Sequence, residues 1–377
     1  MPAGLKAAGA DPHTAAPRID GAEVRVFTVP TDGPGGHESD GTLSWETTTT
    51  VVVSVHAGGE RGIGYTYGDA AVAALIESKL IDLITGASAL RPAAAAAGMQ
   101  HALRNAGRPG IGAMAISAVD VALWDLKARL LELPLADLLP RFHERVPIYG
   151  SGGFTNYDDE RLAAQLRGWV AAGIPRVKVK VGRVPERDPE RLAVAREAIG
   201  PEAELFVDAN GAFTPKQALR WAERYADHGV VYFEEPVSSE DRDGLRFVRE
   251  RAPAGMAIAA GEYEWDLPRL RELAGCVDIL QADVTRCGGI TNMLRADGIC
   301  KSRNQVLSAH CAPAISAHVC AAIETTAHIE YFHDHVRVER ELFAGTLEPD
   351  GGYLRPAPDA PGNGLSLRES AREHEVS

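Results

Sequence analysis

Two lysines set two positions apart are the first side chains in this sequence whose type and spacing could do chemistry. Lys178 and Lys180 alternate with valines in the run Arg-Val-Lys-Val-Lys-Val-Gly at 176–182, and such alternation is typical of a strand that points both lysines to one side. Crowding of two ammonium groups and loss of water both favour the neutral amine. We therefore expect one lysine to accept a proton near neutral pH, although a solvated edge strand would give the same pattern.

Three carboxylates follow, each near the end of a later apolar run. Asp208 lies in Asp-Ala-Asn, Glu234 in Phe-Glu-Glu-Pro and Glu262 in Ala-Gly-Glu. One acidic residue after a strand is often a helix cap, but three in succession would repel one another unless a cation lay among them. Oxygen ligands suit a hard divalent cation such as Mg²⁺, which keeps positions open for water and substrate. The sequence thus predicts a metal site, with Glu235 and Glu264 as rival ligands.

A histidine and an aspartate end the next two apolar runs. If these runs are neighbouring strands, Asp283 can bind one nitrogen of His310, fix its tautomer and raise the basicity of the other nitrogen. We therefore predict an acid/base dyad. Glu330, in the eighth run, could donate a hydrogen bond to a carboxylate oxygen if burial keeps it protonated. The polar run 333–335 is interpreted as part of a loop and not as a second metal site.

These side chains need a scaffold that brings the ends of many strands together. Apolar runs recur roughly 20 to 30 residues apart, the period of repeated strand and helix units. They cover 146–151, 176–182, 204–210, 230–236, 257–262, 277–283, 305–310 and 328–332. Helical patterns lie between them, for example at 160–172, 189–199 and 215–228. The pattern predicts an α/β fold with a parallel barrel. A doubly wound open sheet is the alternative, but no glycine-rich phosphate turn follows the first strand.

The chain before the barrel has a different pattern. Strand-like alternation runs through 19–68, and a helix with one apolar face covers 116–130. We therefore assign 1–18 to a flexible extension, 19–140 to an α+β capping domain and 141–348 to the barrel. The glycine-rich loop 31–43 could be a mobile lid. Its His37, together with Trp45, Tyr65 and Tyr67, could face substrate hydroxyl groups or could be packing residues.

Composition argues against several classes of partner. A formal net charge of −13 disfavours nucleic acid, which needs clustered cations. No apolar run reaches the roughly 18 to 20 residues of a spanning helix, and the start lacks a signal-peptide pattern, so we expect no membrane attachment and no secretion. The five cysteines are odd in number and lack paired spacing, which favours a reducing cytoplasm.

Six motifs in order carry a resemblance to a known family. They are the Lys-Val-Lys strand, Asp-Ala-Asn, Phe-Glu-Glu-Pro, Ala-Gly-Glu, Asp283 five residues before Gly288-Gly289, and Ser-Ala-His310. Over nearly its whole length the chain resembles the mandelate racemase subgroup of the enolase superfamily, in the mandelate racemase and muconate lactonizing enzyme group. The resemblance implies a modified TIM barrel of (β/α)7β type. It also implies that the last stretch, 349–377, returns to the capping domain.

The resemblance further implies roles for individual residues. One Mg²⁺ per subunit would be held by Asp208, Glu234 and Glu262, and would stabilise the enolate of a carboxylate substrate. Lys180 would be one base, and His310, supported by Asp283, the other. Lys178 and Ser151 would contact the substrate carboxylate, Asn210 would hydrogen-bond the substrate and Glu330 would be the electrophilic partner. Relatives of this kind are commonly octamers, so a homo-oligomer is expected.

Three reactions remain open for two bases that flank one carbon. They are dehydration, racemisation or epimerisation, and cycloisomerisation. We favour dehydration of a sugar acid to a 2-keto-3-deoxy acid, because the family holds many such enzymes and the polar loop could face hydroxyl groups. That loop, 31–43, disfavours a phenyl-bearing substrate. A barrel kept only for binding or assembly is a remote alternative, since it would not need acid, base and metal residues together.

Overall fold

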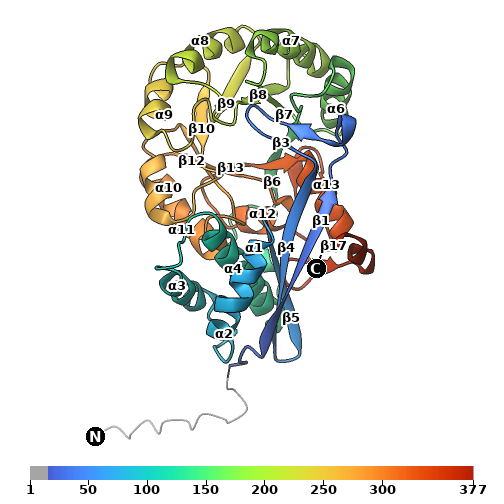
Figure 1. Ribbon diagram of the computed structural model, residues 1–377, viewed down its shortest axis with the longest axis vertical. Coiled ribbons are helices and arrows are strands. Elements are labelled where there is room, and N and C mark those ends of the chain that lie inside the picture. The colour runs from blue at the N-terminus through green and yellow to red at the C-terminus, as the bar shows by residue number, and fades with distance from the viewer. Residues whose placement is uncertain (1–15, 377) are drawn as a thin grey trace, which may run out of the picture.

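Eight parallel strands close into a barrel in the computed structural model, which describes residues 16–376 (Figure 1). The strands follow one another around the barrel in sequence order, and the last pairs with the first through Ile329 and Ile148. They are β6 (Val146–Gly152), β7 (Arg176–Lys180), β8 (Glu204–Asp208), β9 (Val230–Glu234), β10 (Ala257–Ala260), β11 (Ile279–Ala282), β12 (Val306–Ala309) and β13 (Thr326–Phe332). Each overlaps one predicted apolar run, so the predicted barrel is confirmed.

Seven α-helices lie between these strands, within the fully described range 146–332, and cover the outside of the barrel. They are α6 (Asp159–Ala171), α7 (Asp188–Ile199), α8 (Pro215–Ala226), α9 (Arg242–Arg249), α10 (Leu267–Leu273), α11 (Gly289–Ser302) and α12 (Pro313–Cys320). Local sequence fixes where several of these helices begin. Asp158 caps α6, and Thr214 with Gln217 forms a capping box on α8. Eight strands with seven helices give the predicted (β/α)7β order.

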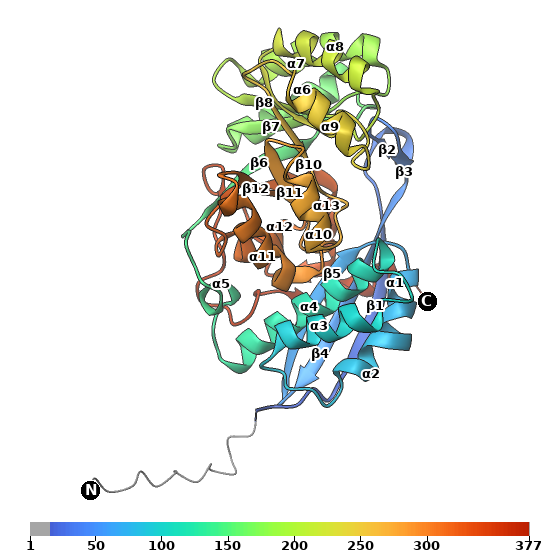
Figure 2. The same ribbon diagram turned by 90° about the vertical axis from the view of Figure 1, so that its left-hand side faces the viewer.

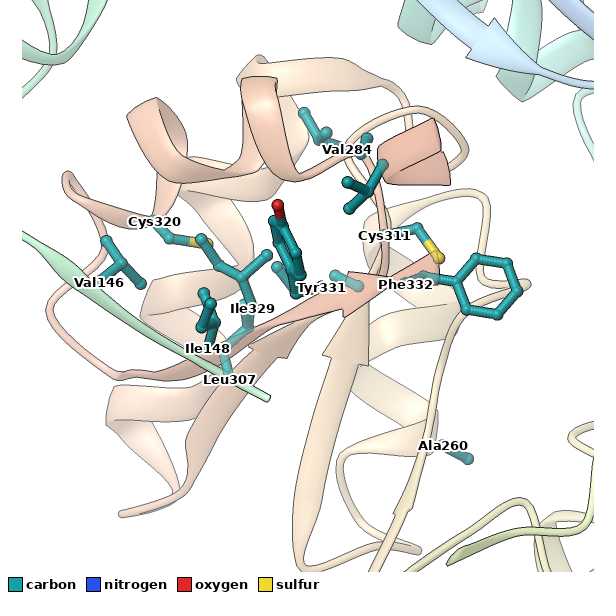
Figure 3. Close-up of a cluster of buried hydrophobic side chains, with 14 of the residues drawn as sticks. Val146, Ile148, Ala260, Val284, Leu307, Cys311, Cys320, Ile329, Tyr331 and Phe332 are labelled. Atoms are coloured by element: carbon teal, nitrogen blue, oxygen red, sulfur yellow. The ribbon is translucent and has the colours of Figure 1, made fainter. Parts of the chain in front are cut away.

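The main hydrophobic core lies between the strands and their helices. Strands of a parallel barrel are buried on both faces, which explains why they read as nearly continuous apolar runs. Figure 3 shows part of this core, where Ile148 of β6 and Ile329 of β13 lie near Leu307 of β12 and Cys320 of α12. None of the described helices is long and apolar enough to cross a membrane.

The capping domain is an antiparallel sheet with helices on one side (Figure 2). Its main strands are β1 (Gly21–Pro30), β4 (Thr47–Ala57) and β5 (Glu60–Tyr67), paired in that order. The helices include α1 (Ala71–Leu75), α2 (Ile81–Ile84), α3 (Pro92–Ala102) and α4 (Ile111–Leu130), the last of which begins before the predicted residue 116. Gly62 and Gly64 of β5 permit close packing, because a Cβ at either would lie 2.2 Å from a backbone oxygen of α4.

The end of the chain contacts both domains. After α13 (His333–Leu342), β15 (Tyr353–Leu354) pairs with β6 of the barrel, and β17 (Glu375–Val376) pairs with β1 of the cap. Asn363 contacts the cap as well, because its side-chain amide donates to the backbone oxygen of Ile63. The predicted extension 1–18 lies outside the described residues as far as position 15.

The predicted lid is a small hairpin that lies against the barrel mouth. Within it, β2 (Glu38–Ser39) pairs with β3 (Ser44–Trp45). Ser39 and Thr155 join their hydroxyl groups at 2.6 Å, and Thr42 donates to the backbone oxygen of Asn210. The hairpin approaches the barrel very closely at Gly41. A Cβ at this position would lie 2.3 and 2.7 Å from backbone oxygens of the barrel. The hairpin thus connects the cap to the loops after β6, β7 and β8.

Candidate active site

Strand register aligns three of the predicted site residues at one end of the barrel. Lys180, Asp208 and Glu234 are the last residues of β7, β8 and β9, and they lie opposite one another as register partners. Their strands run parallel, so their side chains emerge at the same mouth. Lys178 lies two residues before Lys180 and points to the same side, because its ammonium lies 3.6 Å from Asp208 Oδ2. The predicted side of the strand is therefore confirmed for both lysines.

The protonation expected for these lysines is not what the structure shows. Lys180 Nζ lies 2.5 Å from Asp208 Oδ2, and Lys178 Nζ lies 2.6 Å from both Glu234 Oε2 and Glu330 Oε1. Burial by itself would lower the pKa of each lysine, but the attraction of these carboxylates raises both above the ordinary range. The prediction of a neutral amine is thus wrong for the site as it stands. Mutual repulsion between the lysines is outweighed by their acidic partners.

The three predicted metal ligands form one cluster. One carboxylate oxygen from each of Asp208, Glu234 and Glu262 lies within 4.8 Å of the others, and all three residues are buried. Glu234 Oε1 is buried without a hydrogen-bond partner, which leaves a lone pair free for a cation. An all-oxygen, multiply charged donor set fits a hard divalent ion such as Mg²⁺. The residues present therefore fit the predicted metal.

The two rival ligands behave differently from each other. Glu264 faces away from the cluster and binds Arg242 and Arg269. Glu235 is buried beside the cluster, at a positive φ of 36°. Burial, with added repulsion from Glu262, raises the pKa of Glu235 well above its ordinary value. Burial also raises the pKa of Glu234, to about 8, so geometry decides between the two: a carboxylate oxygen of Glu234 lies within the cluster with Asp208 and Glu262, and Glu234 fits the metal role better.

The two residues of the predicted dyad are in contact. His310 Nδ1 lies 2.7 Å from Asp283 Oδ2, which leaves Nε2 directed at Glu262 Oε2, 3.1 Å away. Burial alone would lower the pKa of His310, but the neighbouring Cys311, Glu262 and Glu330 raise it well above the ordinary range. His310 therefore holds its proton more tightly than an ordinary histidine, and it contacts one of the candidate metal ligands.

Glu330 is ionised, contrary to the prediction that burial keeps it protonated. Burial alone would raise its pKa, yet the ammonium of Lys178, 2.6 Å away, holds the pKa of Glu330 below its ordinary value. Ser151 also donates a 2.6 Å hydrogen bond to Glu330 Oε1. In this state Glu330 accepts hydrogen bonds and cannot donate one.

A cavity of about 450 Å³ lies between the barrel mouth and the cap. The predicted site residues that line it are Lys180, Asn210, Glu262, His310, Glu330, Tyr67 and Trp45. Lys178, Ser151, Asp208, Glu234 and Asp283 are fully buried around these residues and do not line it. His37 does not line it either; its backbone oxygen accepts a hydrogen bond from Asn156. The structure thus gives no support to direct substrate contact by His37.

The polar run 333–335 is not a loop, as the sequence suggested, but the first turn of α13. Asp334 accepts a hydrogen bond from Thr48 of the cap and pairs with Arg337. The ring of His335 stacks on Tyr67 at a centroid distance of 3.5 Å. These residues therefore join the barrel to the cap at the edge of the cavity.

Arg286 and Cys311 are among the cavity residues that the sequence analysis did not single out. Arg286 lies 3.7 Å from Asp283 and 3.9 Å from Glu262. Cys311 Sγ lies 3.2 Å from His310 Nε2. The one feature in the sequence that could have indicated these residues is their position, since Arg286 follows Asp283 by three residues and Cys311 is next to His310. Neither residue type is specific enough to be noticed without the fold.

Two family models match the chain. The model described as mandelate racemase / muconate lactonizing enzyme, N-terminal domain, matches residues 22–140, and the model described as enolase C-terminal domain-like matches residues 161–371. Together they cover the cap and most of the barrel.

Characterised relatives are similar over most of the chain. A 3,6-anhydro-alpha-L-galactonate cycloisomerase of Streptomyces coelicolor is 32% identical over 82% of this chain and 86% of its own length. An arabinonate dehydratase of Saccharolobus solfataricus is 33% identical over 73% of this chain and 75% of its own length.

Solved structures agree with this grouping. A mandelate racemase/muconate lactonizing enzyme-like protein from Rubrobacter xylanophilus is 64% identical, with a TM-score of 0.94 over 96% of this chain and 100% of that one. A racemase from Streptomyces coelicolor with bound magnesium is 28% identical, with a TM-score of 0.88 over 95% of this chain and 100% of that one. Because the two family models match its cap and most of its barrel, this chain belongs to the mandelate racemase and muconate lactonizing enzyme family of the enolase superfamily.

Proposed function

We propose that this protein is a Mg²⁺-dependent enzyme that removes the proton next to the carboxylate of a sugar acid, with dehydration to a 2-keto-3-deoxy acid as its reaction. One observation carries the proposal. Lys180 contacts Asp208 and His310 contacts Glu262, so two bases reach the carboxylate cluster from different strands. The strands of the cluster, β8 to β10, lie between β7 and β12 in the barrel order. A substrate anchored at the cluster would have a base on each side.

The metal would be held by Asp208, Glu234 and Glu262. When bound there, Mg²⁺ supplies the positive charge that neutralises these carboxylates and stabilises the charge that develops on the substrate carboxylate. Magnesium bound in the structure of the Streptomyces coelicolor racemase supports this choice of ion.

The chain's own residues would move the protons. In the proposed reaction the α-carbon loses its proton to Lys180, which must first give up its own proton. His310, protonated and held by Asp283, then gives its Nε2 proton to the departing β-hydroxyl, so that water leaves. The resulting enol becomes the 2-keto acid. Lys178, buried and cationic, would stabilise negative charge near Glu330 and Glu234.

A substrate with a single carboxylate suits the cavity best. Lys180 and Arg286 are the lysine and arginine among its described lining residues, and both already contact site carboxylates. The lining also includes Asp40, Asp69 and Asp334. A second substrate carboxylate would meet repulsion from these acids without a further lysine or arginine to pair with. We therefore propose an aldonic acid rather than a diacid.

Epimerisation or cycloisomerisation is the second candidate, because the same two bases serve both and one relative is a cycloisomerase. Incubation with a library of sugar acids and Mg²⁺ in heavy water separates the outcomes. Dehydration gives keto products that react with semicarbazide. Deuterium at the α-carbon without a keto product would instead indicate epimerisation. No product and no exchange across the library would leave the non-catalytic barrel as the better account.

A further inference from the structure

A second group of possible metal ligands lies beside the carboxylate cluster. It consists of His310, Cys311 and Glu330, all buried. His310 Nε2 lies 3.2 Å from Cys311 Sγ and 3.4 Å from Glu330 Oε2, and Cys311 Sγ lies 3.3 Å from Glu330 Oε2. Three different donor atoms, one nitrogen, one sulfur and one oxygen, thus form a nearly equilateral triangle.

The size of this triangle matches one face of a tetrahedral zinc site. Zinc binds nitrogen and oxygen at about 2.0 to 2.2 Å and sulfur at about 2.3 Å, which at tetrahedral angles places neighbouring ligand atoms about 3.3 to 3.6 Å apart. The observed edges of 3.2 to 3.4 Å fall within about 0.2 Å of that interval. A cation could therefore sit on the triangle with little movement of its ligands.

Two further features favour a metal at this position. Asp283 binds His310 Nδ1 at 2.7 Å, which orients the ring and leaves Nε2 as the ligand atom, as carboxylates do for metal-bound histidines. His310, Cys311 and Glu330 all line the cavity, so a fourth position is open to water or a small molecule. The turn that brings the thiol back onto His310 has two successive left-handed residues, Cys311 at φ 48° and Ala312 at φ 45°. Such backbone is costly and persists where the surroundings impose it.

We propose that His310, Cys311 and Glu330 form an inhibitory site for a thiophilic divalent cation such as Zn²⁺. Binding releases two protons to solvent, one from the Cys311 thiol and one from His310 Nε2. The cation then occupies the freed Nε2 lone pair, so His310 can no longer exchange a proton with substrate. The site differs in chemistry from the carboxylate cluster, because a sulfur ligand selects zinc over Mg²⁺. The inhibitory effect rests on the function proposed above, whereas cation binding does not.

Zn²⁺ has no absorption band of its own, so Co²⁺ is used in its place. Co²⁺ bound to a thiolate gives a charge-transfer absorption in the near ultraviolet. We expect the Mg²⁺-loaded full-length protein to develop this band on titration with Co²⁺. Cys311→Ser should lose it and Cys276→Ser should keep it. Cys276 is a suitable control because it is also buried but lies near Arg246, away from the site. No band in the parent protein, or an unchanged band in Cys311→Ser, would overturn the site.

Two further measurements complete the test. After dialysis against Zn²⁺, the parent and Cys276→Ser should retain about one zinc per chain more than Cys311→Ser. With a turned-over substrate and saturating Mg²⁺, micromolar Zn²⁺ should reduce the rate of the parent at least tenfold, relative to its own rate without zinc. Cys311→Ser should lose most of that sensitivity. Equal inhibition of both proteins would refute the regulatory role. The cobalt band does not depend on catalysis, so it tests cation binding even if the protein turns over no sugar acid.

Discussion

Lys180 and Asp208 lie opposite each other on neighbouring barrel strands, with Nζ and Oδ2 only 2.5 Å apart. One candidate base is therefore also the counterion of one candidate metal ligand. The same holds across the cavity, where His310 contacts Glu262 at 3.1 Å. Protonation of the bases and binding of the cation are therefore coupled by these contacts.

Loss of Glu234 should weaken metal binding far more than loss of Glu235. Glu234→Gln removes a ligand and a charge, and loss of even an outer partner of a metal site typically costs about 10- to 100-fold in affinity. Glu235→Gln replaces a carboxyl group whose pKa is raised well above the ordinary range by burial and by Glu262, so the amide resembles the neutral acid already present. Calorimetric titration with Mg²⁺ measures both. An equal loss of affinity in the two variants would show that the ligand is misassigned.

Gly41→Ala should damage catalysis through the hairpin and not through the fold. A Cβ at residue 41 would lie 2.3 Å from the backbone oxygen of Ala209 and 2.7 Å from that of Val181, so the hairpin must move away from the barrel mouth. We expect kcat/KM to fall by about tenfold or more, which corresponds to a rise of about 1.4 kcal/mol in the activation free energy. We expect little change in Tm. Gly21→Ala is the control, because nothing lies within 4 Å of its added Cβ. The idea fails if both variants have parental kinetics.

Acid should destabilise the protein partly through a histidine inside the barrel. Burial lowers the pKa of His328 to about 3, against an ordinary value of 6.5. Between these values the unfolded chain holds more protons than the folded one, so the free energy of unfolding falls as the pH falls through this window. His328→Gln should reduce that slope. Urea denaturation from pH 4 to pH 7 measures it, with the exposed His101→Gln as control, and identical slopes in all three proteins would contradict the assignment.

The acidic lining of the cavity should make the enzyme prefer one carboxylate over two. Matched pairs test this directly, for example gluconate with glucarate and galactonate with galactarate. In each pair the aldonate should have the higher kcat/KM by about tenfold or more, because like charges brought together in a partly buried site cost on the order of 1 kcal/mol or more. The comparison is made at constant ionic strength. Preference for the diacids would mean that an unnoticed cation receives the second carboxylate.

The position of the site residues followed from the sequence because strand periodicity and strand order fix it. Lys180, Asp208 and Glu234 each end an apolar run, and in a parallel barrel such ends converge on one mouth. Protonation did not follow, because it depends on which charges become neighbours. Lys178 and Glu330 lie far apart in sequence and 2.6 Å apart in space, and each reverses the protonation state expected for the other.

The errors in the predictions for residues 333–335 and His37 also arise from contacts between residues far apart in sequence. The helical start of α13 was hidden because its polar residues face Thr48 and Tyr67 of the cap, and sequence alone does not reveal partners in another domain. His37 is a polar residue in a glycine-rich loop, yet it is the backbone oxygen of His37 that accepts a hydrogen bond, from the side chain of Asn156. Local sequence predicted the elements well, whereas contacts between the two domains required the structure.

Hydrogen exchange at the substrate α-carbon tests the central claim most directly. In heavy water with Mg²⁺, Lys180→Ala and His310→Asn are compared with the parent on both α-epimers of a turned-over sugar acid, with circular dichroism to confirm the fold. Each variant should lose exchange and turnover of at least one epimer, by about 10²- to 10⁴-fold as expected for loss of a general base. Full activity of both folded variants on both epimers would contradict the account.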